Sequence, residues 1–155
     1  MVCRFCLCCG VKRRLNGDFD EYSDYAEYLI QGWRSLGVEL DYGQAGRGYI
    51  HNPNCFGTAT GADLVLADGS KLIGSAQLRK GDTVLQHGSM RLNPDADLFA
   101  KVFNQESFSS VQFPETINQE TIIHALIAAA CDCFAMEIAV IPLSEDEWDA
   151  ILDYC

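Results

Sequence analysis

The chain has 155 residues, of which 48% are hydrophobic and 21% are charged, a composition typical of one globular domain with a core. Its formal net charge of −11 argues against a protein that follows nucleic-acid phosphates, because such binding requires clustered Lys and Arg. No apolar run approaches the roughly 20 residues that cross a bilayer. Eight cysteines beside an ordinary hydrophobic core favour the reducing cytoplasm. We therefore expect a soluble cytoplasmic protein that binds neither nucleic acid nor a membrane.

The first 17 residues differ in composition from the rest of the chain. They hold four of the eight cysteines and four of the basic residues, whereas all 22 acidic residues follow them. The cysteine cluster could bind zinc through thiolates, but no second Cys/His pair follows at the spacing of a zinc finger. We therefore predict no metal site and interpret residues 1–17 as a tail outside a packed domain of residues 18–155. The cluster consists of Cys3, Cys6, Cys8 and Cys9.

The first predicted element is a helix over about residues 20–36. Apolar side chains recur there at steps of three and four residues, acidic residues occupy the first turn, and Gly37 stops the helix. Residues 38–42 are expected to form a short strand. The following segment, 43–61, is rich in Gly, Asn, Pro and Thr and is long for an ordinary connection, which is typical of a functional loop.

Residues 62–92 are predicted to form three antiparallel strands. Asp68-Gly69 supplies the first turn and Lys80-Gly81-Asp82 the second, each with a glycine where a positive φ is needed. The middle strand carries Gly74, Ser75 and Ala76 where a core strand normally has bulky side chains. Small residues at such positions indicate that another group comes close to the backbone.

The C-terminal part is predicted to contain three helices and one strand. The helices cover about residues 95–103, residues 119–134, and a last segment that begins at Ser144, where Glu147 completes a capping box. The strand is expected at about residues 137–142. On the second helix we expect a buried side made of Ile122, Ile123, Leu126, Ile127 and Ala130. The predicted fold class is α+β, a mostly antiparallel mixed sheet flanked by helices.

Cys55 and Lys71 are the candidate reactive pair. Cys55 closes the glycine-rich loop and Lys71 begins the middle strand, and the intervening hairpin returns both to the same end of the sheet. A thiol beside an ammonium has a lowered pKa and a larger thiolate fraction, which a cysteine nucleophile needs to accept an acyl group. Composition alone favours a packing role for Cys55, a solvated strand end for Lys71 and a half-buried histidine without a catalytic role for His87.

Four runs of residues resemble the biotin/lipoate protein ligase catalytic family. They are Asn54-Cys55-Phe56, Ala62-Asp63-Leu64-Val65, the block from Lys71 to Arg79 (KLIGSAQLR), and Leu85-Gln86-His87-Gly88-Ser89. Within that family the chain is most similar to the lipoate-protein ligases and the octanoyltransferases. The resemblance extends from about residue 20 to the C-terminus.

The resemblance implies acyl transfer in protein lipoylation, with an octanoyl or lipoyl group moving to a lysine of a lipoyl domain. Cys55 then matches the cysteine that carries the acyl thioester in octanoyltransferases, and Lys71 matches the active-site lysine. The donor is octanoyl-acyl carrier protein, and the transferase needs no cofactor. In the alternative, an ATP-dependent ligase, lipoate, ATP and Mg are required and Lys71 contacts the adenylate. The resemblance further implies that the substrate contacts Gly74, Ser75, Ala76, Gln77, His87 and Gly88.

One part of the family pattern has no match in this chain. Family members carry an R-R-x-x-G-G segment upstream of the helix that begins here near Asp20, and residues 1–17 do not reproduce it. We therefore expect only part of the catalytic domain, with an exposed sheet edge. This leaves a third interpretation open, a non-catalytic acyl-binding or partner-dependent remnant, and it makes self-association or a complementing N-terminal half conceivable.

Overall fold

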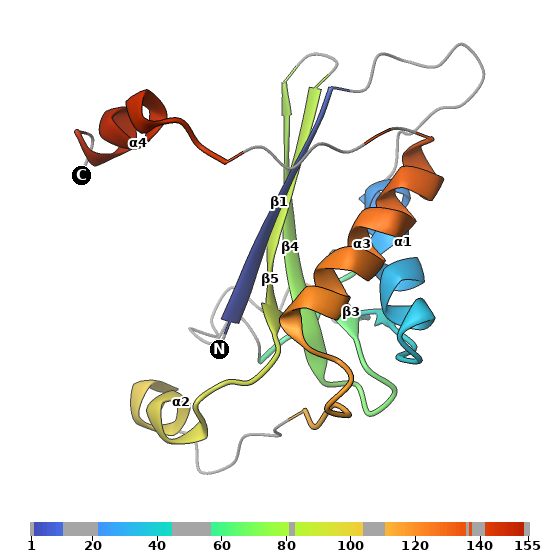
Figure 1. Cartoon of the computed structure of the whole chain (residues 1–155). Helices are drawn as coiled ribbons and strands as arrows, with labels where there is room; N and C mark the ends of the chain where they lie inside the picture. The colour runs from blue at the N-terminus through green and yellow to red at the C-terminus, as the bar shows by residue number, and fades with distance from the viewer. Residues whose placement is uncertain are drawn as a thin grey trace.

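A five-stranded antiparallel sheet forms the centre of the described part of the protein, in the order β1-β5-β4-β3-β2. The structure is a computed structural model that describes residues 2–10, 22–44, 57–80, 83–103, 111–135, 137 and 142–153, with the backbone alone for 2–10, 22–25, 79–80 and 83–84. The long strands β4 and β5 form a hairpin at the middle of the sheet (Figure 1). The strands are β1 (Val2–Gly10), β2 (Asp41–Tyr42), β3 (Leu64–Val65), β4 (Lys71–Lys80) and β5 (Thr83–Arg91).

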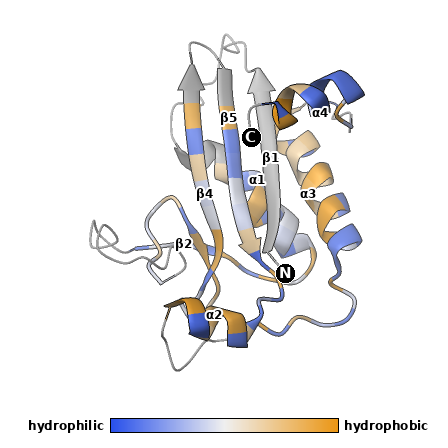
Figure 2. Ribbon diagram, turned by 90° about the vertical axis from the view of Figure 1, so that its left-hand side faces the viewer, coloured by the Kyte–Doolittle hydropathy of each residue, from blue (hydrophilic) through white to orange (hydrophobic). Residues whose placement is uncertain are grey.

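Helices α1 (Tyr22–Ser35) and α3 (Gln119–Phe134) lie side by side over one face of the sheet (Figures 1 and 2). A Cβ at Gly32 would lie 2.7 Å from Leu126 Cδ2, so this glycine lets the two helices approach closely. The core lies between this helix pair and the sheet. Its largest fully buried side chains are Trp33, Leu29, Leu64, Leu72, Ile73, Met90 and Gln86.

Helices α2 (Ala96–Phe103) and α4 (Glu145–Leu152) lie apart from this helix pair (Figure 1). Neither helix contains a buried residue. Ser144 caps α4, since its side chain accepts a hydrogen bond from Glu147 N while the Glu147 carboxylate accepts one from Ser144 N. None of the helices in the described ranges has the length and apolar character needed to traverse a bilayer.

The structure confirms most of the elements predicted from the sequence. The α+β class, the first helix, the antiparallel strands of 62–92, the helices near 95–103 and 119–134, and the capping box at Ser144 are all present. Gly37 and Gly69 have φ values of +82° and +78°, as expected for a helix stop and a turn. The turn at 81–82 and the interior of the strand expected at 137–142 lie outside the described residues.

The interpretation of residues 1–17 as a tail is wrong for residues 2–10. They form β1, which pairs with β5 along its whole length, from Val2 opposite Arg91 to Gly10 opposite Thr83. The physical reason is the apolar character of this segment. Cysteines behave as small hydrophobic residues in packed structure, and Arg4 is the only charged residue among these nine, so the segment suits a strand beside the β4–β5 hairpin.

Two further predictions need correction. The strand expected at 38–42 is shorter and covers Asp41–Tyr42 only. On α3, Ile123 is 43% exposed, because the buried stripe runs through Ile122, Ala129, Ala130 and Phe134 and Ile123 lies 100° round the helix from Ile122.

Candidate active site

A buried ion pair lies at the start of β4. Lys71 Nζ lies 3.0 Å from Asp63 Oδ1, and the two side chains are only 8% and 7% exposed. Lys71 Nζ also donates a hydrogen bond to the Thr58 carbonyl oxygen at 3.3 Å. The interpretation of Lys71 as a solvated strand end is therefore wrong, because its ammonium is directed into the protein rather than into solvent.

Asp63 holds the segment that precedes β3 with its other carboxylate oxygen. Thr60 N and Thr60 Oγ1 donate to Asp63 Oδ2 at 2.8 and 2.9 Å. The backbone closes the same turn, since Asp63 N donates to Thr60 O at 2.9 Å, and Gly43 N donates to Asp63 O at 2.9 Å. A carboxylate can accept several hydrogen bonds at once, and Asp63 uses this capacity to join two segments of the chain.

Gly74 gives Lys71 the space that it needs. A Cβ at this position would lie 3.1 Å from Lys71 Cε and 3.4 Å from Lys71 Nζ, distances at the tight end of van der Waals contact. The lysine side chain therefore crosses β4 directly over the glycine. The group that comes close to the backbone at Gly74 is therefore the Lys71 side chain of the protein itself.

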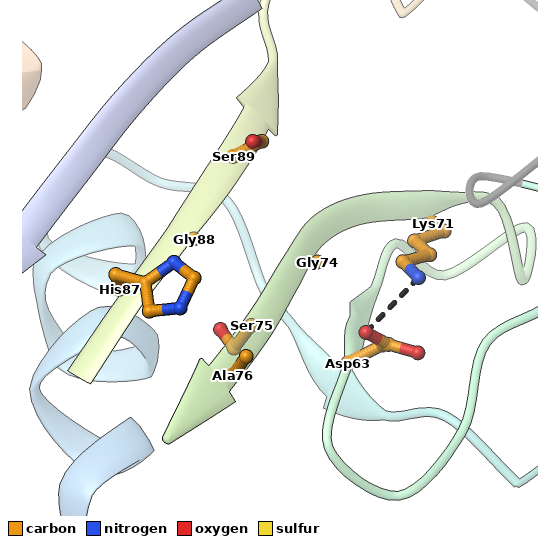
Figure 3. Close-up of a pocket in the computed structure, with 8 residues that line it drawn as sticks. All are labelled: Asp63, Lys71, Gly74, Ser75, Ala76, His87, Gly88 and Ser89. Atoms are coloured by element: carbon orange, nitrogen blue, oxygen red, sulfur yellow. Dashed lines mark ion pairs between the residues drawn. The ribbon is translucent and has the colours of Figure 1, made fainter. Parts of the chain in front are cut away.

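A pocket of about 240 Å³ extends from this ion pair along β4 and β5 (Figure 3). In register, Gly74 lies opposite Ser89, Ser75 opposite Gly88, and Ala76 opposite His87. The pocket therefore lies where the two strands carry mostly small side chains, and His87 is the largest residue contributed by β5. Its lining consists of Asp63, Lys71, Gly74, Ser75, Ala76, His87, Gly88 and Ser89.

The pocket combines the Lys71 ammonium with walls of mostly small residues. The Ser75 Oγ atom is shielded from solvent and has no hydrogen-bond partner among the residues that the structure describes. Buried hydroxyls normally have such a partner, but this one is too well shielded to be reached from the open pocket. The ammonium of Lys71 can stabilise negative charge on an oxygen or sulfur atom brought into the pocket.

The structure gathers most of the residues that the sequence predicted for the site. Lys71 and five of the six residues expected to contact substrate line one pocket, whereas Gln77 lies one step further along β4, opposite Gln86, and does not line it. Cys55 lies outside the described residues. The sequence argument did not single out Asp63, although an acidic residue directly before a strand and beside the glycine-rich loop was an available signal.

Comparison with known proteins matches residues 4–125 to the family model of the lipoyl protein ligase A/B catalytic domain. An octanoyltransferase LipM from Carboxydothermus hydrogenoformans is 29% identical over 126 residues, which are 81% of this chain and 45% of that protein. The chain thus spans about half the length of the curated relatives that it matches.

Two solved structures share the fold. A lipoate-protein ligase A bound with ATP superposes with a TM-score of 0.65 at 16% identity, over 97% of this chain and 59% of that one. A bi-partite lipoate protein ligase from Thermoplasma acidophilum, studied with its E2 lipoyl domain, gives a TM-score of 0.63 at 17% identity, over 98% and 58%. Because the family model covers well over half of the residues, the chain belongs to the lipoyl protein ligase A/B catalytic domain family.

Proposed function

We propose that this chain takes part in protein lipoylation as an acyltransferase, moving an octanoyl group from octanoyl-acyl carrier protein to a lysine of a lipoyl domain. The observation that carries the proposal is the buried Lys71 ammonium at the end of a pocket with small-residue walls. Pockets that enclose drug-sized ligands measure about 300–1,000 Å³, so the smaller pocket here suits a narrow acyl chain. The named LipM relative supports the choice of octanoyl transfer.

Cys55 is the proposed nucleophile. Lys71 Nζ donates to the Thr58 carbonyl, and Thr58 is three residues from Cys55 in the chain. Three residues of extended chain span at most about 11 Å, so the length of the chain between Cys55 and Thr58 is compatible with a nucleophile near this ammonium. An ammonium near a thiol favours the thiolate, which is the reactive form.

The proposed reaction has two steps that balance without a further reactant. The Cys55 thiolate attacks the octanoyl carbonyl carbon, a carbon–sulfur bond forms, and the carrier leaves as its thiolate, which takes up a proton. The amine of the lipoyl-domain lysine then attacks the Cys55 thioester, an amide bond forms, and the cysteine sulfur leaves and regains the proton lost by the amine. The Lys71 ammonium donates to the carbonyl oxygen as negative charge develops on it.

Intact-protein mass spectrometry tests the proposal. The purified chain is mixed with octanoyl-acyl carrier protein without ATP, and we expect a mass gain of one octanoyl group. Cys55→Ser should abolish the gain. Cys131→Ser is the matched control, because Cys131 is a partly buried cysteine on α3, and it should leave the gain intact. Octanoylation that persists in Cys55→Ser would remove Cys55 from the mechanism.

The alternative function is ATP-dependent lipoate ligation, which the ATP-bound relative supports at the level of the fold. In that case Lys71 contacts the adenylate and Mg accompanies the ATP. Lipoate and ATP without any carrier protein should then give lipoyl-adenylate, detectable as release of pyrophosphate. Pyrophosphate release without octanoyl transfer would favour the ligase over the transferase.

A third candidate, a remnant that binds acyl groups or a partner, draws support from the partial coverage of the relatives. Neither octanoyl transfer nor pyrophosphate release is then expected from the chain alone. Activity that returns when a separate N-terminal half from a LipM relative is added would indicate a partner-dependent enzyme rather than an inactive remnant.

A further inference from the structure

Asp63 connects two parts of the candidate site through a single carboxylate. Its Oδ1 atom lies 3.0 Å from the Lys71 ammonium on β4. Its Oδ2 atom accepts from both the amide and the hydroxyl of Thr60, at 2.8 and 2.9 Å, on the segment that leads back to Cys55. The Asp63 carboxylate therefore contacts both the Lys71 ammonium and Thr60, and links β4 to the segment before β3.

The segment held by Asp63 is also fixed from the side of β2. Gly43 donates its amide to the Asp63 carbonyl at 2.9 Å. A Cβ at Gly43 would lie 2.5 Å from the carbonyl oxygens of both Ala59 and Thr60, so the two backbones are in direct contact here. Because this part of the loop is anchored, a change in Asp63 would be felt mainly by Lys71 and by the Thr60 side chain.

A lysine has a flexible stem and three donors, so its ammonium needs several restraints to stay at one place. Asp63 Oδ1 and the Thr58 carbonyl provide two fixed directions for Lys71 Nζ. A buried ion pair by itself adds little net stability, which leaves orientation of the ammonium as the stronger reason for this geometry.

On these grounds, and resting on the proposed acyl transfer, we propose that Asp63 is a positioning residue that holds the Lys71 ammonium at a fixed place relative to Thr60. Asp63 acts through Lys71 and Thr60 and need not touch the substrate. Its removal should lower the rate of Cys55 acylation and leave the binding of octanoyl-acyl carrier protein nearly unchanged.

The test is a set of variants of the whole chain, assayed by single-turnover octanoyl transfer at several carrier concentrations. Asp63→Asn should lower the maximal rate about 100-fold, as expected for a catalytic group displaced by about 1 Å. Thr60→Val removes one hydrogen bond to a charged acceptor and leaves the ion pair in place, so about a tenfold loss is expected. The half-saturating carrier concentration should change less than about threefold in both variants, because binding and positioning are separate effects.

A variant that combines Asp63→Asn with Thr60→Val shows whether the two residues act together or independently on the rate. If Thr60 acts through Asp63, the double variant should be no slower than Asp63→Asn alone, whereas independent effects would multiply to about 1,000-fold. Asp68→Asn is the matched control, because Asp68 also accepts from a neighbouring side chain and amide, those of Ser70, but on an exposed turn. Its rate should stay within about twofold of the unaltered chain.

The outcomes distinguish this inference from the proposed function. If the unaltered chain takes up no octanoyl group, the proposed function fails and the role of Asp63 falls with it. If the unaltered chain is acylated and both single variants keep its rate, the role of Asp63 alone is overturned. If Asp63→Asn does not fold, Thr60→Val decides, since it keeps the buried ion pair, and an unchanged rate in that variant overturns the inference.

Discussion

Replacing Lys71 by methionine should destabilise the fold by about 3 kcal/mol. Methionine retains most of the apolar stem that crosses Gly74, but it leaves the Asp63 carboxylate buried without its cation. Removing one member of a buried pair typically costs about 3–5 kcal/mol. We take the lower end, because the two hydrogen bonds from Thr60 still satisfy one oxygen of that carboxylate.

A second variant shows that the loss comes from the unpaired charge. In Lys71→Met combined with Asp63→Asn no charge is buried, so about 2 kcal/mol should be recovered and only about 1 kcal/mol lost, roughly one hydrogen bond. Arg34→Met is the matched control. The Arg34–Glu39 pair has the same 3.0 Å separation, but its side chains are 53% and 69% exposed, and such surface pairs contribute less than about 1 kcal/mol.

Urea unfolding followed by tryptophan fluorescence measures these differences. Trp33 is completely buried in the core, whereas Trp148 is 53% exposed, so the change in the signal on unfolding comes chiefly from Trp33. With an m value of about 2 kcal/mol per molar urea, Lys71→Met should lower the midpoint by about 1.5 M. A midpoint equal to that of the unaltered chain, or a double variant as unstable as Lys71→Met, would refute the argument.

Two other predictions concern the glycine beside the lysine and a cysteine on α3. Gly74→Ala should lower octanoyl transfer about tenfold by displacing Lys71 a few tenths of an ångström, whereas Gly61→Ala, where the nearest atom to an added Cβ is 3.9 Å away, should not; equal rates in the two variants would contradict this. Burial, and secondarily the charges of Glu27 and Asp132, raise the pKa of the Cys133 thiol. Because the folded-state pKa lies above the unfolded one, the stability contributed by the neutral thiol is complete at lower pH and is lost as the pH rises through the folded-state value. Peptide mapping of iodoacetamide labelling should give a midpoint at higher pH in the folded chain than in urea, and coincident midpoints would exclude the effect.

The elements that could be predicted from the sequence are those whose pattern is local. The stripe on α1, the glycine stop at Gly37 and the capping box at Ser144 each depend on residues within a few positions of one another, and all three are present. The pairing of β1 depends instead on partners 73 to 89 residues away, since Gly10 lies opposite Thr83 and Val2 lies opposite Arg91. Nothing local distinguishes a cysteine-rich tail from an apolar strand, which is why this assignment failed.

The residues of the candidate site also differ in how far the sequence alone could identify them. The block from Lys71 to Ala76 and the run around His87 could be identified because family resemblance attaches roles to a motif. Asp63 lies in another of these runs, but no role was attached to it, because its pairing depends on side-chain distances across the turn between β3 and β4. The pairing of a buried ammonium with a carboxylate is a property of the fold, and only the three-dimensional structure shows that these two residues meet.

The run of small residues in β4 has two explanations that act at different positions. At Gly74 the neighbouring Lys71 side chain already occupies the space, so the glycine positions the cation and does not itself widen the pocket. Ala76 is exposed and lies opposite His87, and Ser75 lies opposite Gly88, so here the absence of bulk leaves the wall of the pocket open. Enlarging Ala76 should therefore compete with a ligand, whereas enlarging Gly74 should disturb the lysine. The sequence pattern alone treats these neighbouring positions as equivalent, and the structure gives each a separate physical role.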